Sequence, residues 1–484
     1  MKRIKYIIWV LPVLALFISC KKEKKEPITP EIVEKIVHKL PEINNAVLES
    51  SVIYEANIRQ YSKEGTFNAF TKDIPQIKQL GVKIIWLMPI FPISETNRKA
   101  TGGDFAYKIE DEAERAKMLG SYYAVSDYTK INPEFGTIED FRKLVKTAHD
   151  NGIYVILDWV PNHTGWDHVW ITDHPDYYTQ NEKGEIVDPT NPETGESWGW
   201  GDVADLNYDN PEMRREMIED MSYWVADEGV DGFRCDVASN VPTDFWEQAI
   251  PQLRVQKDIF MLAEAWQPEL LEGDLFDMAY TWEGHHIMNE IAQGKKNVSD
   301  LKHYLEANKT KYASDDILMN FVTNHDENSW NGTVKERMGD ASEIMTALSY
   351  MLPGMPLIYS GQEYGLDYRL KFFEKDSIPK TKGDTWTLLE QLGQLKNTHP
   401  ALNGGKEAAN LTMVDVENPN ILIFEREKGE DKILFIGNLS KEKQEVKLTI
   451  SGGFSDYQSN ENVNLEEGEG LTLAPWEFKI LIKK

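Results

Sequence analysis

The sequence predicts an α/β protein: a (β/α)8 TIM barrel with a subdomain inserted after the third strand, followed by a C-terminal antiparallel β-sandwich domain. Three observations lead to this prediction. Eight short apolar runs alternate with amphipathic segments between residues 50 and 400. One connection, after the third run, is conspicuously long. Beyond Pro400 the pattern changes to short runs with a period of two residues, which is typical of antiparallel strands.

The apolar runs have the character of strands that are buried on both faces. Nearly every position is apolar, as a parallel barrel requires, because helices cover its outer face. Amphipathic segments such as Ile138–Asp150 and Pro211–Asp227 separate the runs and are expected to be helices. The eight predicted strands are Val52–Arg59, Val82–Pro89, Ile153–Val160, Val230–Val237, Ile259–Ala265, Leu275–Thr281, Leu318–Asn324 and Met355–Ser360.

The long connection runs from Pro161 to about Gly229. Its first part, Asp173–Asp209, is rich in Asn, Gly, Trp and Pro and has little helical period. This favours an inserted domain B of about residues 161–210 within a catalytic barrel of residues 50–400. Residues 401–484 form the predicted β domain. Its strands are expected at Ile421–Arg426, Lys432–Asn438, Gln444–Ile450 and Leu471–Ile482.

Composition and charge narrow the class of protein. Hydrophobic residues make up 41% of the 484 residues and charged residues 27%, which excludes a disordered or collagen-like chain. Lys and Arg number 52 against 80 Asp and Glu, so the net charge is -28. A phosphate backbone would be repelled by that field, and we therefore expect no nucleic-acid partner.

The first twenty residues are typical of an exported bacterial lipoprotein. Lys2, Arg3 and Lys5 precede an apolar run, residues 7–18, that is too short to span a bilayer. The run ends in residues 16–20 (LFISC), which resemble a lipobox and predict a lipidated Cys20. A plain signal peptide with cleavage elsewhere is the alternative.

We expect residues 1–20 to be the signal segment and residues 21–49 a tether and linker. The lipid anchor would then be the membrane contact of an exported enzyme. It would face the periplasm or the outside of the cell. The start of the tether (KKE) lacks the acidic residues of some surface-export tags, which favours the periplasmic side.

Polar and charged residues gather where the predicted strands end. The third strand ends at Asp158–His163 (DWVPNH), the fourth at Arg234–Asp236, the fifth at Glu264 and the seventh at Asn324–Asp326. Barrel enzymes place their active sites at this end of the strands. A single acid at a strand end is often a structural ion pair. A buried cluster of acids is costly unless the charges are paired or used, so their convergence indicates a catalytic site.

These strand ends resemble the short motifs of glycoside hydrolase family 13, the α-amylase family. The resemblance covers roughly residues 50–484. It includes Asp158–His163, Gly232–Asp236, Glu264, Asn324–Asp326, Ala204–Asn207 and Gly354–Glu363, all in the order of the family. A single motif of this kind is weak, whereas the full set on an eight-strand frame is specific.

The resemblance implies retaining hydrolysis through a covalent intermediate. In such enzymes a nucleophile and an acid stand about 5–5.5 Å apart, and neighbouring strands four and five can place Asp236 and Glu264 in this way. By resemblance Asp236 attacks the anomeric carbon, Glu264 is the acid and base, and Asp326 holds hydroxyl groups of the distorted sugar. Arg234 precedes Asp236 by two residues, so both face the lumen, where the guanidinium keeps Asp236 ionised.

Further residues are assigned by resemblance. Arg234, His163 and His325 are assigned to the substrate-binding residues, and the two histidines are expected to donate hydrogen bonds to the bound sugar. Tyr123 resembles the ring that stacks under it, with Tyr122 as the alternative. Asn162 and Asp205 match positions that bind a structural Ca²⁺ in many α-amylases, and their oxygens suit that ion.

Two departures from the family pattern bear on the substrate. Ala124 stands where exo-acting members often have an Asp, which favours an endo-acting cleft. Val237 resembles the residue found at this place in α-1,6-acting oligosaccharidases, whereas Ala or Thr is commoner in α-1,4 enzymes. This residue therefore favours an oligo-1,6-glucosidase. Ser239 and Asn240 replace a Lys-His pair that serves acceptor binding and calcium in many α-amylases.

The predicted function is therefore an endo-acting hydrolase of α-1,4 bonds in starch or maltooligosaccharides. An oligo-1,6-glucosidase or a transglycosylase of the same family is the alternative. A non-catalytic glycan-binding lipoprotein is the alternative from another class; such relatives generally lack one residue of the catalytic triad, and all three are present here.

Overall fold

The computed structural model describes residues 40–191, 194–273 and 275–484. The predicted signal segment, Cys20 and most of the tether lie outside the described residues. Within the described residues no helix is both long and apolar enough to cross a membrane.

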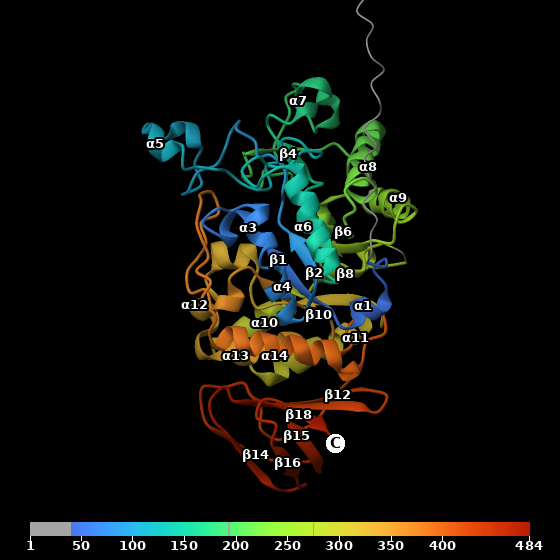
Figure 1. Cartoon of the computed structure of the whole chain (residues 1–484), viewed down its shortest axis with the longest axis vertical. Coiled ribbons are helices and arrows are strands. Elements are labelled where there is room, and N and C mark those ends of the chain that lie inside the picture. Colours follow the sequence, from blue (N-terminus) through green and yellow to red (C-terminus); the bar gives the residue numbers. More distant parts are fainter. Residues whose placement is uncertain (1–39, 192–193, 274) are drawn as a thin grey trace, which may run out of the picture. The chain divides into compact units, whose positions relative to one another are not determined.

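Eight parallel strands close into a barrel, which confirms the predicted fold class (Figure 1). Their order around the barrel is β1-β10-β9-β8-β7-β6-β3-β2, and every neighbouring pair is parallel. The strands are β1 (Val52–Ala56), β2 (Val82–Leu87), β3 (Tyr154–Trp159), β6 (Gly232–Cys235), β7 (Phe260–Ala263), β8 (Met278–Tyr280), β9 (Ile317–Asn320) and β10 (Met355–Tyr359).

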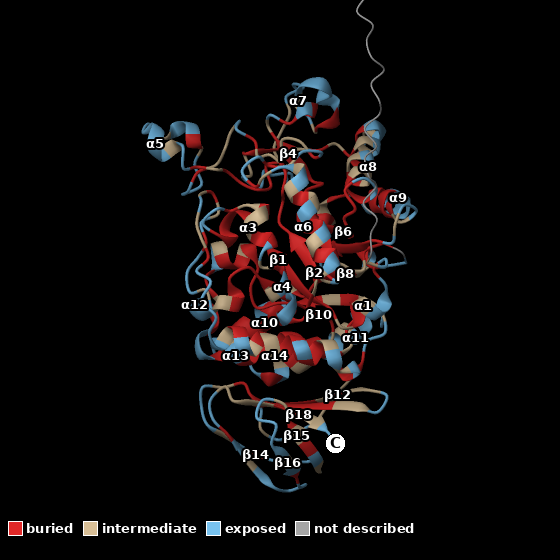
Figure 2. Cartoon of the chain, in the orientation of Figure 1, coloured by how far each residue is buried: buried red, intermediate tan, exposed pale blue. Residues whose placement is uncertain are grey.

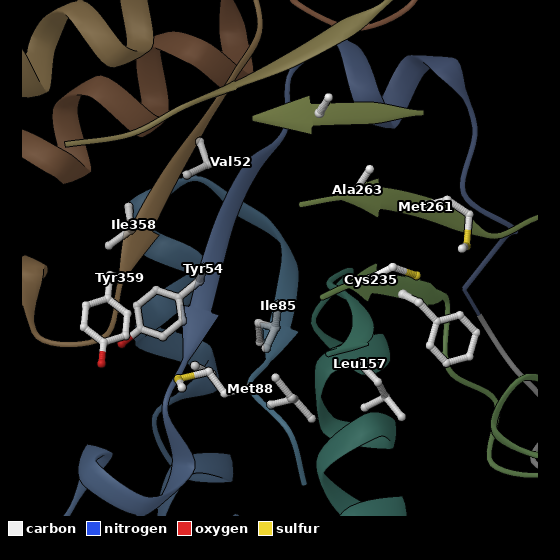
Figure 3. Packing of buried hydrophobic residues seen from close by; sticks show 14 of the residues in the cluster. Val52, Tyr54, Ile85, Met88, Leu157, Cys235, Met261, Ala263, Ile358 and Tyr359 are labelled. Carbon is white, nitrogen blue, oxygen red and sulfur yellow. The ribbon is translucent and has the colours of Figure 1, made fainter. Parts of the chain in front are cut away.

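Alternate residues of these strands enter two separate cores. Ile53, Ile84 and Leu262 belong to a cluster drawn from alternate positions of the strands, which fills the lumen. Val52 and Ile85 point the other way and pack in the cluster shared with the surrounding helices (Figure 3). Both sets are fully buried, which explains why the strands read as continuous apolar runs.

Several helices around the barrel bury one face against the strands and expose the other (Figure 2). In α6 (Ile138–Asp150) the buried residues include Phe141, Leu144 and Ala148, and a capping box between Thr137 and Asp140 starts the helix. The other α-helices of the described residues are α1 (Asn45–Glu49), α2 (Ile58–Tyr61), α3 (Phe67–Thr71), α4 (Ile74–Ile77), α5 (Glu112–Arg115), α7 (Val169–Asp173), α8 (Pro211–Ala226), α9 (Thr243–Arg254), α10 (Trp282–Ala292), α11 (Val298–Lys311), α12 (Val334–Met338), α13 (Ser342–Met351) and α14 (Asp384–Thr398).

Two connections, not one, are long on the side of the barrel that carries the site. The connection after β3 holds α7 and the short antiparallel pair β4 (His163–Gly165) and β5 (Val203–Asp205). The connection from β2 to α6, residues 88–137, is also long, and the expectation of a single long connection was wrong. Its hydrophobic residues, such as Ile90 and Phe91, are buried in the core. In the sequence this segment therefore looks like part of a helix or strand and does not stand out as a long connection.

The C-terminal residues form a six-stranded antiparallel sheet of order β11-β12-β13-β18-β15-β16 and a two-stranded sheet of β14 and β17. Residues of both sheets share one core, among them Ile423, Leu434 and Leu473. The predicted run Leu471–Ile482 is two strands that belong to different sheets. The strands are β11 (Asn410–Met413), β12 (Ile421–Lys428), β13 (Asp431–Asn438), β14 (Gln444–Lys447), β15 (Gly452–Asp456), β16 (Asn462–Leu465), β17 (Gly470–Leu473) and β18 (Phe478–Lys483).

Candidate active site

A cleft of about 750 Å³ opens where the barrel strands end. Asp236 and Glu264 directly follow β6 and β7 and line the cleft, and the segment after β9 adds His325 and Asp326. Tyr123 and His163 come from the long connections after β2 and β3. The structure thus brings together at one cleft the predicted catalytic residues and three of the four predicted sugar-binding residues, and the fourth, Arg234, lies directly beneath.

Arg234 is the fully buried centre of this site. Its Nη1 lies 2.7 Å from Asp236 Oδ1 and 2.8 Å from Asp158 Oδ1, and its Nη2 lies 3.0 Å from Glu264 Oε2. The rings of Trp86 and Tyr280 lie 4.9 and 5.9 Å from the guanidinium carbon. One cation therefore holds three carboxylates from three adjacent strands, and this pairing offsets part of the cost of burying them, since burial still raises the pKa of all three carboxyl groups.

Asp236 and Glu264 share this guanidinium but differ in exposure. The side chain of Asp236 is 11% exposed and that of Glu264 is 17% exposed, and both line the cleft. Burial raises the pKa of each carboxyl group above its usual range, and Arg234 opposes this rise in both. An acid with a raised pKa beside a carboxylate paired to arginine is the arrangement that glycosidic bond cleavage requires.

His325 is held as an imidazolium. Its Nδ1 lies 2.5 Å from Glu55 Oε1, and its Nε2 lies 2.8 Å from the Tyr123 hydroxyl and 3.2 Å from Asp326 Oδ2. Tyr123 donates its only proton to Asp158, so it accepts from His325. Burial alone lowers the pKa of His325, but Asp326 and Glu55 outweigh burial and raise this pKa to about 9.

Comparison with known proteins agrees with this geometry. The profile of the Alpha amylase catalytic domain matches residues 44–391. The chain belongs to the alpha-amylase family. The profile of the Maltogenic Amylase C-terminal domain matches residues 411–480. The protein is thus a glycoside hydrolase of the alpha-amylase family, and its barrel and C-terminal sheet domain are those of alpha-amylase structures.

Individual relatives differ in activity. The chain is 26% identical to the alpha-amylase MalA of Haloarcula japonica over 85% of its own length and 59% of that protein. It is 28% identical to a 4-alpha-glucanotransferase of Thermotoga neapolitana over 62% of its own length and 68% of that protein. A crystal structure of an alpha-amylase from Lactobacillus plantarum matches 91% of the chain and all of that protein, with a TM-score of 0.77 and 28% identity.

The choice between Tyr122 and Tyr123 is made by their positions. Tyr123 lines the cleft of this alpha-amylase-family enzyme, and its ring is stacked with that of His325 at 5.4 Å. Tyr122 is buried beneath, where its hydroxyl donates to Asn57 and Arg59 lies over its ring. Tyr123 is therefore the ring that can meet a bound sugar.

His163 lies in the wall of the cleft next to the two predicted calcium residues. Burial lowers the pKa of His163 to about 4, so it is neutral at pH 7 and can offer a single N–H donor. Its ring packs against Trp200 at 5.8 Å. Its backbone pairs with that of Asp205 in the β4–β5 ladder, and the carbonyl of Asn162 accepts from Leu206, so that the predicted pair is brought together.

Asn162 and Asp205 alone supply too few oxygens for calcium, which takes six to eight. Among the described residues there is no group of three or more His, Cys, Asp or Glu side chains that could hold a metal ion. Burial raises the pKa of Asp205 to about 6. Calcium stays a prediction.

Several residues of the site were not predicted from the sequence. Glu55 and Trp86 lie on β1 and β2, and Asp158 on β3 was quoted in a motif but given no role. Trp86 Nε1 donates to Asp158 at 3.1 Å. A carboxylate inside an otherwise apolar strand such as residues 52–56 (VIYEA) is the signal that could have found Glu55.

The rim of the cleft comes from loops that are distant in sequence. Lys99 forms an ion pair with Asp202 at 3.1 Å, and Thr101 donates to Glu374 at 2.6 Å. Trp330 is 51% exposed and packs on Phe372, 5.0 Å between ring centroids. These contacts join the loops after β2, β3, β9 and β10, and no local sequence pattern marks them.

Glu55→Gln is expected to lower the pKa of His325 by one unit or more from about 9, because it removes a carboxylate that raises this pKa while burial, which lowers it, remains. At pH 8 half or more of the rings would then lose their proton. The titration of the His325 ring protons by NMR measures this, with His325→Asn to assign the signal. Glu363→Gln is the matched control, since Glu363 is equally buried but bonds to Tyr54. An unchanged titration in Glu55→Gln would refute the assignment.

Proposed function

We propose that this enzyme is a retaining, endo-acting hydrolase of α-1,4 glucosidic bonds in starch or maltooligosaccharides. The observation that carries the proposal is the single guanidinium of Arg234 bridging Asp236 and Glu264 at the cleft. Two carboxyl groups on adjacent strands and on one cation are close enough for one to attack and the other to protonate the same glycosidic bond.

In the proposed reaction Asp236 attacks the anomeric carbon while Glu264 gives its proton to the departing oxygen. Burial raises the pKa of Asp236, and Arg234 opposes this rise and so favours the anion that must attack. Glu264 then takes a proton from the water that hydrolyses the glycosyl-Asp236 ester. Asp326, His325 and His163 line the same cleft and are proposed to hold the hydroxyl groups of the distorted ring.

The rate is expected to show a bell-shaped dependence on pH. Asp236 must be ionised, so kcat/KM falls as the pH drops through its pKa. Glu264 must be protonated, so kcat/KM falls as the pH rises through the pKa of Glu264, which burial places above the usual range.

Glu264→Gln is expected to remove the basic limb and to lower kcat about 10²- to 10⁴-fold on starch. The kcat of this variant on a maltosyl fluoride should fall less, because fluoride is a leaving group that needs no proton. A basic limb that survives in Glu264→Gln would assign the acid to another residue.

The substrate preference is tested by a product time course on soluble starch, pullulan, isomaltose and panose, using protein that lacks residues 1–20. Asp236→Ala runs beside it. Early release of mixed maltooligosaccharides from starch supports the proposal. Ala124 is buried and offers no carboxylate to grip a terminal sugar, in accord with an endo-acting cleft.

Two alternatives give other products. Glucose from isomaltose and panose with starch untouched would indicate an oligo-1,6-glucosidase, as the side chain of Val237 suggests. Longer glucans formed from maltooligosaccharides would indicate a transglycosylase, the activity named for the Thermotoga relative. No turnover of any of the four substrates, with binding retained, would indicate a glycan-binding lipoprotein.

We further propose export and anchoring through a lipidated Cys20, on the sequence pattern of residues 1–20. Labelled fatty acid should appear in the wild-type protein and not in Cys20→Ala. Protease treatment of whole cells distinguishes the cell surface from the periplasmic side. The predicted Ca²⁺ is tested by thermal unfolding in EGTA with and without added CaCl₂.

A further inference from the structure

The residue that follows the proposed nucleophile has an unusual backbone. Val237 adopts φ 44° and ψ 42°, in the left-handed region. Among the described residues the other non-glycine positions with positive φ are Asn97, Asn460 and Trp476. Asn tolerates this conformation, whereas a β-branched side chain such as valine adopts it very rarely. Such backbone outliers gather at functional sites, where the surrounding structure enforces them.

The conformation ends strand β6 directly after Asp236. The amide of Asp236 still follows the ladder and donates to Trp159 of β3 at 2.8 Å. On the other side the amide of Glu264 donates to Cys235 at 3.0 Å. Successive strand amides point to opposite neighbours, so the N–H of Val237 faces the β7 side. Because the chain turns here into a 3₁₀ turn, Ala238–Asn240, this N–H is left outside the ladder.

The freed N–H binds the proposed acid. It donates to Glu264 Oε2 at 2.8 Å, and Arg234 Nη2 lies 3.0 Å from the same oxygen. Among the described residues Arg234 Nη2 makes no hydrogen bond in this geometry, so its contact with Oε2 is an ion pair. An oxygen that accepts a main-chain N–H and faces a cation is the less favourable place for a proton. Within the described part of the chain no residue hydrogen-bonds the other oxygen, Oε1, and the carboxyl group lines the cleft. The transferable proton of Glu264 therefore belongs on Oε1.

We propose that Val237 is a positioning residue: its left-handed backbone presents the main-chain N–H to Glu264 Oε2, which orients the carboxyl group and keeps its proton on Oε1 for the departing sugar. This inference rests on the proposed role of Glu264. It concerns the backbone of Val237 and is independent of what its side chain does for linkage preference.

The test removes this N–H without changing any side chain. Val237 is replaced by its α-hydroxy acid through suppression of an amber codon, which exchanges the amide N–H for an ester oxygen and keeps the side chain. The same codon decoded with valine is the control. The N–H favours the ionised form of Glu264, so its loss should raise the pKa of Glu264. We expect the basic limb of kcat/KM to move to higher pH by about half a unit or more and kcat to fall about 10-fold.

Val237→Gly is the matched variant, because glycine adopts the left-handed conformation freely and keeps the N–H. Its basic limb should stay where the wild type has it, even if its KM changes with the loss of the side chain. If Val237 had only a structural role, both variants would be less stable, and the basic limb of kcat/KM in the ester variant would stay at the wild-type pH. A wild-type limb in the ester variant, or the same shift in Val237→Gly, would overturn the proposal.

A second measurement separates this proposal from the proposed function. Infrared difference titration, with Glu264→Gln as the reference, reports the protonation of Glu264 without any turnover. If the enzyme hydrolyses none of the test glucans, the proposed function fails, yet the titration still decides whether the Val237 N–H affects Glu264. An unchanged titration in the ester variant would overturn the inference whatever the activity.

Discussion

Asp236→Asn is expected to lower kcat on starch roughly 10⁴-fold or more, with the fold intact. The amide has the shape of the carboxylate but is too weak a nucleophile to form the covalent intermediate. Arg234 would keep its contacts to Asp158 at 2.8 Å and to Glu264 at 3.0 Å, so the site should not collapse. Product assays measure kcat, and thermal unfolding of the same preparation shows whether the fold is intact.

The control for this variant is Asp220→Asn, the same chemical change on α8 at a half-buried carboxyl group away from the cleft. It should leave kcat within about two-fold, as is usual for changes remote from the reacting atoms. Turnover by Asp236→Asn within ten-fold of wild type would contradict the assignment of the nucleophile.

Chemical rescue would distinguish a nucleophile from a merely stabilising charge. Asp236→Gly leaves a space into which azide can enter from the same face of the sugar. Attack by azide on the anomeric carbon should release the leaving group and yield a glycosyl azide of inverted configuration. Recovery of hydrolysis without this product would indicate that Asp236 acts only through its charge.

Arg426→Ala is expected to cause the largest loss of stability, about 3–5 kcal/mol. Arg426 lies on β12 of the C-terminal domain and is fully buried. It donates to the carbonyl oxygens of Met351 at 2.8 Å, Asn403 at 2.9 Å and Ala409 at 3.3 Å, which belong to the end of α13 and the segment that enters the β domain. Its removal leaves three carbonyl groups without this donor; the contacts to Met351 and Ala409 are buried and the one to Asn403 is partly buried.

Urea unfolding monitored by Trp fluorescence measures the effect, and a separate transition of the C-terminal domain would show that the domains have uncoupled. Arg426→Lys should be intermediate, because an ammonium group keeps the charge but not the planar fork. Lys432→Ala on the neighbouring strand removes only partly exposed ion pairs to Glu425 and Glu427 and should cost less than about 1 kcal/mol. Equal losses in Arg426→Ala and Lys432→Ala would contradict the proposed role.

The barrel could be predicted because its physical requirements are local. The buried runs around β1 to β10 need apolar residues on both faces, and α6 needs an apolar stripe and a capping box, so each leaves a direct trace in the sequence. The C-terminal run Leu471–Ile482 shows the limit. Apolar residues continue through the turn at Ala474–Glu477, although their alternation changes phase there, so one predicted strand is in fact β17 and β18, each with different partners.

Glu55 shows why part of the site could not be predicted. It is one carboxylate in an apolar strand, and its partner His325 lies 270 residues further along the chain. The rim contacts of Lys99 with Asp202 and of Thr101 with Glu374 likewise join loops whose sequences carry no shared pattern. Contacts of this kind depend on loop geometry and on which side chains the closed barrel places opposite one another.

The sequence by itself determined the barrel, the order of its strands along the chain, the C-terminal β domain and the residue types at the strand ends, because periodicity and short motifs encode burial and chemistry locally. The tertiary structure alone decided that Arg234 binds three carboxylates at once, that Tyr123 and not Tyr122 faces the cleft, that Glu55 supports His325, and that Val237 turns its N–H to Glu264. These are contacts between distant segments, and their distances and protonation states follow from burial and from neighbouring charges that come together only when the barrel closes.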